Sequence, residues 1–568
     1  MKNLFLLLTF AFCIVNCQPT TTTEKEKAIT SINPTLPFQP NVVWLVAEDL
    51  SPVIPSFGDS TIQTPNISRL ATEGVCYDNV YSPSPVCAPS RAALSTGMYP
   101  NHMAASHMRT GPWFATDIPE KFIKQFDQYM PEGMSNYEAL PPVGTRMFSE
   151  YLREEGYYCT NNAKQDYQYR CSLTAWDETS DQAHWKNRKV GQPFFAIFNF
   201  NECHESQIWA RAKDSLWVDE NLEVPIPPYL PDTDIAKKDV RRMYSNVKLM
   251  DHRVGILLKE LEEQNLLDST IIFWYTDHGG PLPRQKRLLY DSGLKVPMVI
   301  RFPNQQFAGQ RDDQMISFID FGVTVLSLLG IQAPKVDGKA FLGKYKEAER
   351  PFIYAAADRF DESYDANRAV RDKRYKYIKY YQPEKPMYLP INYRNQMPIM
   401  QELNRLVAED NLTPAQALWF RKTKPVEELF DTEQDPHEIT NLADDPAYAN
   451  KLKELRTKCE TWVNSFQHTG LMPEKELVEK LRPGGKEWKV AQPTIKEIDG
   501  LISLNCETEA ATIGYQISSK KQQPASWTIY TKPFQLNEGD TLKVVGDRIG
   551  YRYSEKAFYY ATKLDFSH

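Results

Sequence analysis

The sequence predicts an α/β layered fold, and the basis is three buried-strand patterns together with one long helical pattern. The strand patterns are continuous apolar runs at residues 42–46, 194–200 and 270–276. Short runs of this kind are typical of strands that are covered on both faces. Between the second and the third run, apolar residues recur at helical spacing from Val240 to Leu261, as in a helix with one buried face. Strands that alternate with helices indicate a layered α/β domain.

Each predicted strand ends in polar residues of the kind that bind metals or catalyse reactions. In chain order these residues are Glu48 and Asp49, then His204, then Asp277 and His278. In α/β sheets, ligands gather beyond the carboxyl ends of the strands. We therefore expect the three groups to converge on one site.

The composition is that of a soluble protein with more than one domain. A chain of 568 residues is too long for a single compact core. Its 66 basic and 73 acidic side chains give a formal charge of −7, and nothing in the sequence has the basic stripe of a nucleic-acid-binding protein. Aromatic residues make up 12% of the chain, which suits stacking on sugars and equally suits a large core.

The first 17 residues have the pattern of a signal segment. Lys2 precedes an apolar run that is too short to span a bilayer, and Cys17 follows it. The end of the run resembles a bacterial lipobox, in which the cysteine is acylated, but Asn16 replaces the usual small residue, so ordinary signal cleavage stays open. Residues 18–37 are typical of a flexible tether. We expect an exported protein that is lipid-anchored to the bacterial outer membrane or periplasmic, and that contacts the membrane only through this anchor.

The cysteines indicate neither a zinc site nor a disulfide scaffold. The chain has nine of them, without a CxxC pair or a dense framework. Cys159 and Cys171 could pair in an oxidising compartment or could stay reduced. The sequence leaves these two alternatives open.

The pattern changes near residue 480, which predicts a domain boundary. Residues 482–485 (RPGG) interrupt the chain, and short strand patterns separated by turns follow them. We predict a small β-sandwich-like domain over residues 488–568. It would serve as a structural cap or as a module that faces a glycan.

The most specific pattern is CAPSR at residues 87–91, followed by LSTG at 94–97. It closely resembles the C-x-P-S-R and L-x-T-G pattern of the formylglycine-dependent sulfatases. The resemblance implies that a formylglycine-generating enzyme oxidises Cys87 and that the hydrated aldehyde is the nucleophile. A geminal diol suits this chemistry, because its second hydroxyl can lose a proton and expel sulfate without attack by water. A helix that starts near Ser90 would favour an anion at position 87.

The same resemblance implies a metal site. The family's opening strand normally ends in two aspartates, and here Glu48 replaces the first and Asp49 is the second. Asp277 and His278 match the second metal segment. Together with the formylglycine oxygen at Cys87 they make a mainly oxygen donor set, which favours one Ca²⁺ over Zn²⁺. The nitrogen of His278 leaves Mg²⁺ or Mn²⁺ open.

Further residues match the family's sulfate-binding positions. Arg91 would hold the formylglycine hydrate and the metal carboxylates. Lys164 and Lys286 resemble the two lysines that contact sulfate, and His204 resembles the histidine that protonates the leaving oxygen. The family usually has a histidine two residues after the first lysine, and this chain has Asp166 there. The base is therefore either Asp166 or a histidine from elsewhere.

Residues 107–109 (HMR), after GMYP at 97–100, resemble a bacterial branch of the family that is labelled heparan N-sulfatase-like. The resemblance implies that His107 and Arg109 contact the sugar beside the sulfate pocket, with a packed loop as the alternative. An imidazole has a reference pKa of about 6.5 and an aspartate one of about 3.9. We therefore expect His107, rather than Asp166, to accept the proton during release of sulfate.

The resemblance as a whole implies an alkaline-phosphatase-like sandwich over residues 38–475, with a smaller C-terminal α+β subdomain from about residue 350. The implied reaction is hydrolysis of a sulfate ester on a carbohydrate, such as ulvan, another algal glycan or a glycosaminoglycan. Alternatives are an N-sulfatase acting on heparan-type sugars, a phosphohydrolase of the same superfamily and a non-catalytic glycan-binding lipoprotein. Cys87 argues against the phosphohydrolase, and the retained metal acids argue against the binding protein.

Overall fold

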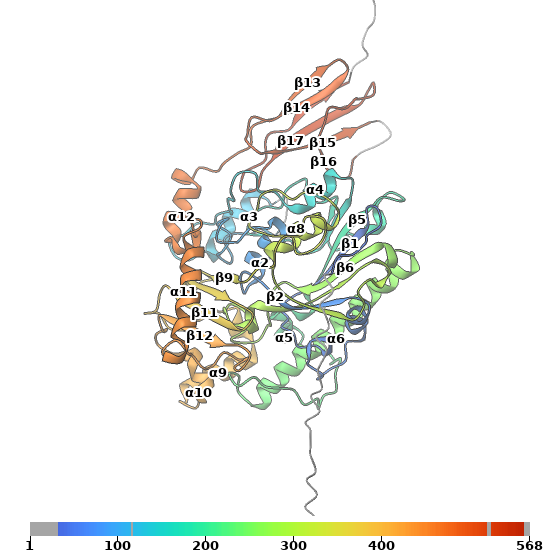
Figure 1. The fold of residues 1–568 in the computed structure, drawn as a ribbon. Helices are drawn as coiled ribbons and strands as arrows, with labels where there is room; N and C mark the ends of the chain where they lie inside the picture. Colours follow the sequence, from blue (N-terminus) through green and yellow to red (C-terminus); the bar gives the residue numbers. More distant parts are fainter. Residues whose placement is uncertain (1–31, 115–117, 520–523, 562–568) are drawn as a thin grey trace, which may run out of the picture. The chain divides into compact units, whose positions relative to one another are not determined.

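A mixed eight-stranded sheet carries the fold, with the strand order β4-β3-β5-β1-β6-β7-β2-β8 (Figure 1). The strands are β1 (Asn41–Ala47), β2 (Val75–Tyr81), β3 (Tyr158–Asn162), β4 (Glu178–Thr179), β5 (Phe194–Phe200), β6 (Thr270–Thr276), β7 (Lys295–Arg301) and β8 (Gln310–Ser317). The three runs predicted as buried strands are β1, β5 and β6, and β1 pairs in parallel with both of the others. The predicted α/β fold is therefore confirmed, and the carboxyl ends of the three strands lie at one edge.

The computed structural model describes residues 32–114, 118–519 and 524–561, and residues 33–568 form one unit. The predicted signal segment with Cys17 lies outside the described residues, as does most of the predicted tether. Among the described residues, no helix is long and apolar enough to cross a membrane.

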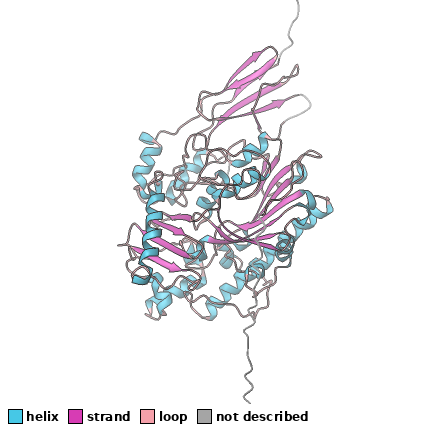
Figure 2. Ribbon diagram, viewed as in Figure 1, coloured by secondary structure: helices cyan, strands magenta, loops and turns pink. Residues whose placement is uncertain are grey.

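Helices cover both faces of the large sheet (Figure 2). The α-helices are α1 (Pro65–Glu73), α2 (Cys87–Thr96), α3 (Glu120–Gln125), α4 (Phe148–Glu154), α5 (Ser206–Ala210), α6 (Asp234–Glu263), α7 (Asp291–Leu294), α8 (Ile319–Leu328), α9 (Pro398–Ala408), α10 (Pro414–Ala417), α11 (Ala449–Val463) and α12 (Glu474–Leu481). On one face, Trp44 of β1 packs against Phe148 of α4 and Phe321 of α8. On the other face, the apolar side of α6 joins the core. The buried residues of α6 follow the predicted helical spacing. The one exception is Leu257, which was expected on the buried side and is only partly buried, whereas Leu258 is buried.

A second, antiparallel sheet has the order β12-β11-β10-β9. Its strands are β9 (Ile353–Ala357), β10 (Asn367–Arg371), β11 (Tyr375–Tyr380) and β12 (Glu427–Asp431). Helix α11 packs on it through Leu455 and Cys459, which share a buried cluster with Val370 and Tyr377. The sheet lies where the C-terminal subdomain is predicted, and the boundary near residue 350 stays a prediction.

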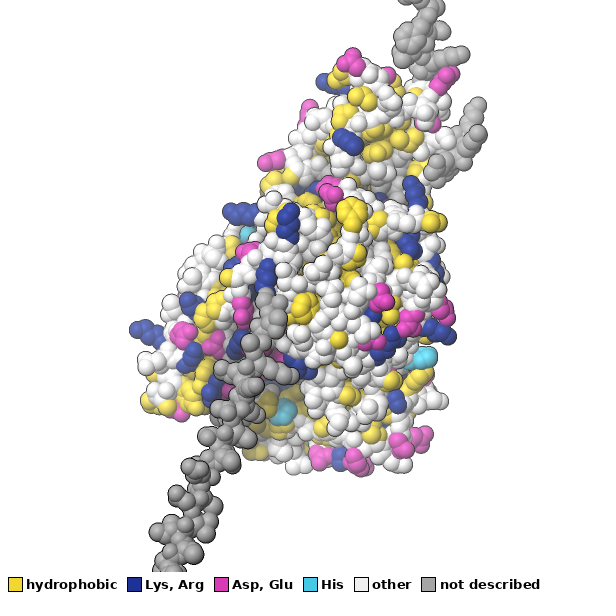
Figure 3. Space-filling view, turned by 45° about the vertical axis from the view of Figure 1, so that its right-hand side comes forward, with side chains coloured by type: hydrophobic (Ala, Val, Ile, Leu, Met, Phe, Trp, Pro, Cys, Tyr) yellow, Lys and Arg dark blue, Asp and Glu magenta, His cyan; other side chains and the backbone are white. Residues whose placement is uncertain are grey.

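The C-terminal tail is built from short strands, as its sequence pattern predicts. A two-stranded sheet joins β13 (Thr494–Ile498) and β14 (Leu501–Asn505), and a four-stranded sheet joins β15 (Thr512–Ser518), β16 (Thr528–Ile529), β17 (Thr541–Asp547) and β18 (Ala557–Tyr560). Ile502, Leu504, Leu542 and Val544 form its small core. Hydrophobic side chains also gather on the surface of the tail (Figure 3), where Tyr560 is exposed. The domain boundary at residue 488 stays a prediction.

Hydrogen bonds join the tail to α4 and to the segment that follows β3. The buried Asp547 carboxylate accepts from the Ser172 hydroxyl at 2.8 Å and from the Leu173 amide at 2.6 Å. Arg153 donates to the backbone oxygen of Trp527 at 2.7 Å. Because these groups are withdrawn from water, losing one partner leaves the other unsatisfied.

Cys159 is a free thiol, and its sulfur lies 3.7 Å from the backbone oxygen of Ser149. The sulfur of Cys171 lies 3.7 Å from that of Met147. The structure therefore has no disulfide between Cys159 and Cys171. Of the two alternatives left open by the sequence, it has the reduced pair.

The contacts of Asp547 predict how the tail is held. Replacing Asp547 by alanine should lower stability by about 1–3 kcal/mol, because two buried donors lose their acceptor. Urea unfolding should show the loss, and limited proteolysis near residues 483–491 should become faster. Glu538→Ala, at an exposed position of the same tail, is the matched control. Equal proteolysis of the two variants would contradict the prediction.

Candidate active site

The parallel register of the central strands brings the predicted polar groups together. Ala47, the last residue of β1, lies opposite Phe200 of β5 and Thr276 of β6. The residues that follow these strand ends bond to one another: the Asp277 amide donates to the Ala47 oxygen at 3.1 Å, and the Asp49 amide donates to an Asp277 carboxylate oxygen at 3.1 Å. The expected convergence at one edge is therefore what the fold produces.

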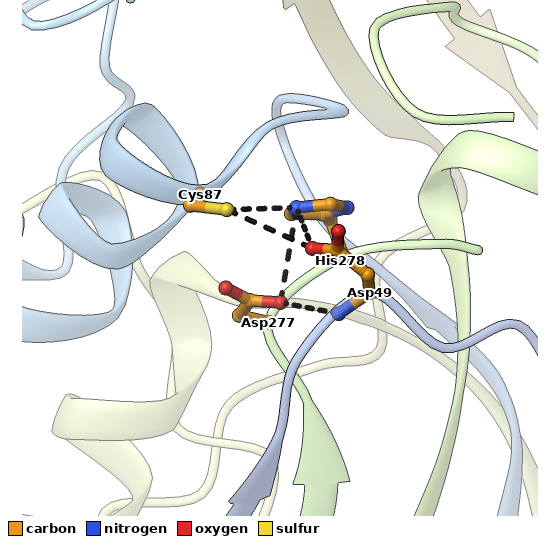
Figure 4. A group of neighbouring side chains, drawn as sticks. All are labelled: Asp49, Cys87, Asp277 and His278. Carbon is orange, nitrogen blue, oxygen red and sulfur yellow. Dashed lines mark hydrogen bonds and ion pairs between the residues drawn. The ribbon is translucent and has the colours of Figure 1, made fainter. Parts of the chain in front are cut away.

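Cys87 is the first residue of α2 and is fully buried. The helix starts at Cys87, three residues before the expected start at Ser90, and ends at Thr96. Gly97 follows it with a φ of 73°, which suits glycine. The sulfur lies 3.2 Å from Nε2 of His278 and 3.7 Å from a carboxylate oxygen of Asp49 (Figure 4). The nucleophile position thus lies where the positive end of a helix meets the end of the sheet.

Two lysines make the surroundings of Cys87 favour an anion. Burial raises the pKa of the thiol, but the charges of Lys164 and Lys286 together bring it down to about 6. A thiol in this position carries negative charge at neutral pH. Any oxygen nucleophile with a titratable proton at position 87 would be stabilised as an anion for the same reason.

Asp49, Cys87, Asp277 and His278 form a buried group whose ligand atoms all lie within 4.8 Å of one another. Nε2 of His278 is 3.0 Å from Asp49 and 3.8 Å from Asp277. Burial lowers the pKa of His278, but Asp277, Cys87 and Asp49 raise it to about 10. This concentration of negative charge is what a divalent cation would neutralise, and Nδ1 of His278, 3.0 Å from the Gly279 backbone oxygen, orients the ring toward the group. The donor set therefore fits a metal ion.

Glu48 is not one of the four residues of this group. One of its carboxylate oxygens lies 2.9 Å from Nζ of Lys164, and the other lies 3.4 Å from Nη2 of Arg91. In this arrangement Glu48 neutralises two cations. Its role as a metal ligand stays a prediction.

Arg91 has the contacts expected of a residue that holds the metal carboxylates. Its Nε donates to Asp277 at 3.0 Å, and its Nη1 donates to the side-chain oxygen of Asn199 at 2.6 Å. Asn199 belongs to β5, and no sequence motif indicated it. The buried guanidinium is therefore fixed between β5 and β6.

Lys286 and His204 lie beside each other, and Lys286 also contacts Asp49. Nζ of Lys286 is 2.7 Å from Asp49 and 3.4 Å from Nε2 of His204. Nδ1 of His204 is 2.8 Å from the Ser206 hydroxyl, which orients the ring with Nε2 toward the lysine. Lys286 and His204, predicted from separate motifs, are thus brought together by the fold.

No sequence pattern indicated Glu205 or Arg287. The two residues pair with each other, and Glu205 also contacts Lys286. Arg287 donates two hydrogen bonds of 2.8 Å to Glu205 and one of 3.2 Å to Asp361. Glu205 also lies 3.2 Å from Lys286. Burial raises the pKa of Glu205, but Arg287 and Lys286 hold it well below its ordinary value. Each missed residue directly follows a predicted one, yet only the fold shows that Glu205 and Arg287 pair.

Arg109 and Asp166 lie at the border of the site. Nη1 of Arg109 is 3.4 Å from Asp166, and Nζ of Lys164 is 3.8 Å from the same carboxylate. Burial raises the pKa of Asp166, but Arg109, Lys164 and Arg91 bring it below its ordinary value. Asp166 is therefore an ionised partner of the cations around position 87.

His107 is not brought into the group. Its Nδ1 lies 2.8 Å from the Tyr137 hydroxyl and 3.4 Å from Glu474, and burial holds its pKa well below the ordinary value. Among the described residues it has no contact with Cys87, Lys164 or Asp166. The expectation that His107 accepts the proton thus lacks the contact it requires, and the alternative of a packed loop fits its position.

Four residues at the site have left-handed backbone conformations. Asp49, Arg109, Asp166 and Arg287 have φ values of 49°, 61°, 59° and 77°. Such conformations are uncommon for residues with a side chain and cost roughly 1–3 kcal/mol each. The ion pairs of these four residues offset that cost and hold the side chains in place.

Comparisons with known proteins identify the family. The sulfatase family model matches residues 40–331, and the model of the N-sulphoglucosamine sulphohydrolase C-terminal region matches residues 284–417. An ulvan-active sulfatase of Formosa agariphila is 46% identical, over 97% of this chain and 96% of its own. Human N-sulphoglucosamine sulphohydrolase is 23% identical, over 78% of this chain and 94% of its own.

Solved structures share the fold. A structure in complex with its substrate D-glucosamine-2-N,6-O-disulfate has a TM-score of 0.53 at 17% identity and covers 77% of this chain and 100% of its own. A 2-O GAG sulfatase has a TM-score of 0.52 at 20% identity and covers 75% and 92%. These matches confirm the alkaline-phosphatase-like architecture. The sulfatase model spans more than half of the chain, and the relative from Formosa agariphila spans nearly all of it, so the chain belongs to the sulfatase family and is a sulfuric ester hydrolase.

Proposed function

We propose that the enzyme hydrolyses sulfate esters of carbohydrates, with formylglycine made from Cys87 as the nucleophile and one bound Ca²⁺. The observation that carries the proposal is the position of Cys87. It lies at the start of α2, between two lysines that favour an anion and a buried acidic group that fits a cation. A formylglycine-generating enzyme is the partner that this chemistry requires during maturation.

The residues around position 87 have three proposed roles: nucleophile, metal ligands and sulfate ligands. As a hydrated aldehyde, formylglycine would supply one oxygen that attacks sulfur and a second hydroxyl that, on losing its proton, forms the carbonyl again and expels the sulfate held by the first oxygen. A cation held by Asp49, Asp277 and His278 would supply Lewis acidity, and its oxygen-rich donors favour Ca²⁺. Lys164 and Lys286 approach position 87 closely enough to shift its pKa, and we assign them to the oxygens of the bound sulfate.

Proton transfers fall to His204 and Asp166. Nε2 of His204, beside Lys286, donates a proton to the oxygen that leaves with the sugar as its bond to sulfur breaks. Asp166, beside Lys164 and Arg109, accepts the proton of the second hydroxyl as sulfate departs and the carbonyl forms again. This assignment replaces His107, which lies with Tyr137 and Glu474.

The proposed substrate class is a sulfated polysaccharide or its oligosaccharides. Ulvan comes first, because the 46% identical relative is named for its activity on it. Cleavage of N-sulfate on heparan-type sugars is the second candidate, because the N-sulphoglucosamine sulphohydrolase C-terminal model matches residues 284–417. Sulfate release from ulvan oligosaccharides, compared with release from N-sulfated glucosamine, decides between them.

Location completes the proposal. The signal pattern of residues 1–17 supports export, and Cys17 is the proposed site of acylation. The lipid would hold the enzyme at the outer membrane, where large polysaccharides or their fragments arrive.

The first prediction concerns the nucleophile. Peptide mass spectrometry of the fragment that contains Cys87 should show replacement of the thiol by an aldehyde. Cys87→Ala should abolish hydrolysis and leave thermal unfolding near that of the wild type, because only a small side chain is trimmed. An active enzyme with an unmodified Cys87 would overturn the mechanism.

The metal prediction rests on the buried acidic group. A chelator should abolish activity, and Ca²⁺ should restore it better than Zn²⁺. Asp277→Ala should lower kcat/KM at least about a thousandfold, because the lost Lewis acid contributes several kcal/mol. Glu263→Ala, at an exposed position at the end of α6, is the control. Full activity after chelation and dialysis would exclude a metal.

The proton acceptor can be identified by trapping. Asp166→Asn keeps the shape of the side chain but removes the base, so sulfated enzyme should accumulate and appear in the intact mass after mixing with substrate. His107→Ala should instead lower the melting temperature, because Tyr137 and Glu474 lose a buried partner, and it should not accumulate sulfated enzyme. The opposite pattern would restore His107 as the acceptor.

A further inference from the structure

Tyr393 lies at the sugar side of the proposed reaction centre. Its side chain is 38% exposed, and its ring centroid is 6.3 Å from that of His204. Among the exposed large hydrophobic residues in the described part of the chain, Tyr393 alone has a ring contact with a predicted site residue. Trp209 of α5 meets Tyr393 nearly at right angles, with centroids 5.2 Å apart. In the proposed mechanism His204 protonates the oxygen that joins sulfate to sugar, so the sugar would lie against these neighbours.

The loop that carries Tyr393 is anchored on both sides. The next residue, Arg394, is buried, donates to the Leu389 oxygen at 2.6 Å and lies over the ring of Trp419. The preceding residue, Asn392, donates its amide to Glu362 at 2.6 Å. A half-exposed aromatic ring on such a fixed loop loses little conformational freedom when a ligand covers it.

Arg109 supplies an available cation beside this aromatic pair. Its side chain is 40% exposed, and its ion pair with Asp166 is long, at 3.4 Å. Burial lowers the pKa of Arg109, but Asp166, Asp361, Cys87 and Tyr393 raise it. One short segment connects Arg109 with the tyrosine: Arg359 bonds to Met108, next to Arg109, and Glu362 accepts from the amide of Asn392, next to Tyr393. The backbone of its neighbour Met108 exchanges hydrogen bonds with Arg359, at 2.8 Å and 3.0 Å.

Positive charge in this region is not fully neutralised. The buried Arg394 has no carboxylate partner among the described residues, and burial together with Arg287 lowers its pKa to about 10. A guanidinium that is still mainly protonated at neutral pH contributes a positive potential at the adjacent surface. An anionic sugar is favoured over a neutral one at such a surface.

We propose that Tyr393, Trp209 and Arg109 form a subsite for the sugar ring that bears the sulfate ester, and that the sugar carries a second anionic group. Tyr393 and Trp209 contact the ring, and Arg109 binds the anion, which is a uronic acid carboxylate or a further sulfate. The inference rests on the proposed function and adds the recognition of the sugar to the chemistry at sulfur.

The test separates binding of the sugar from binding of sulfate. The mature enzyme and its variants are compared in KM for sulfated uronate-containing oligosaccharides and in the inhibition constant of inorganic sulfate. Tyr393→Ala should raise KM roughly tenfold, which corresponds to one lost aromatic contact, and should leave sulfate inhibition unchanged. Tyr393→Phe should retain most of the affinity. Tyr381→Ala is the matched control, because Tyr381 is also 38% exposed.

Substrate changes identify the anion. Arg109→Ala should raise KM for the native oligosaccharide, and the increase should disappear when the carboxylates are reduced to alcohols if the anion is a uronate. If the anion is a second sulfate, the increase should persist after carboxyl reduction and disappear on a singly sulfated sugar. An equal increase on a substrate without any second anion would overturn the role of Arg109.

Two further outcomes are decisive. If the wild type cleaves sulfated oligosaccharides and Tyr393→Ala binds them equally well, the subsite is wrong and the proposed function stands. If the wild type releases sulfate from an aryl sulfate but from no sulfated oligosaccharide, the proposed carbohydrate function and the subsite fail together.

Discussion

Charge neutralisation in a buried space is the constraint on which the active site depends. Asp49 and Asp277 are wholly removed from water, and so is position 87 between them. An unpaired charge at such depth would cost several kcal/mol, so each one needs an opposite charge beside it. Arg91 and Lys286 meet this need directly. The same pairing that stabilises the fold therefore prepares a site in which an anion at position 87 and a cation next to it are both favoured.

A second layer of ion pairs links the chemistry to recognition. Glu205 and Arg287 support Lys286 and reach Asp361, in the segment between β9 and β10. The neighbouring Glu362 holds the loop of Tyr393, and Arg359 holds the backbone next to Arg109. The segment between β9 and β10 thus contacts residues that hold Lys286, the lysine proposed to bind sulfate, and residues that hold the proposed sugar subsite. We expect changes of sugar specificity in this fold to arise in that segment, because it does not contribute to the central ion pairs of Arg91 with Asp277 and of Lys286 with Asp49.

Glu48 contributes to the charge balance of the site. An aspartate at this position is the family's usual residue, and the longer glutamate reaches Lys164 and Arg91. The four-residue group at position 87 is formed without it. The charge balance of the site is preserved either way, since Glu48 neutralises cations that would otherwise repel a bound metal.

The sequence alone predicted the chemistry of the centre, because the residues that would carry it belong to short local motifs. The α/β class followed from strand and helix periodicity, and Cys87, Asp49 and Asp277 followed from short patterns at strand and helix ends. Arg109 was also indicated by a motif, but its contact with Asp166 became visible only in the fold. Local patterns are informative in these cases because the side chain and its backbone setting are close in sequence.

Only the tertiary structure decided the partners that lie far apart in the chain. It placed His107 with Glu474, placed Glu48 beside Lys164 and Arg91, and paired Glu205 with Arg287. It also brought Tyr393 to His204 across nearly two hundred residues of chain. None of these contacts has a sequence signal, because each depends on how separate loops pack at the edge of the sheet. Packing, rather than any motif, sets which charges meet and which aromatic ring lies beside His204.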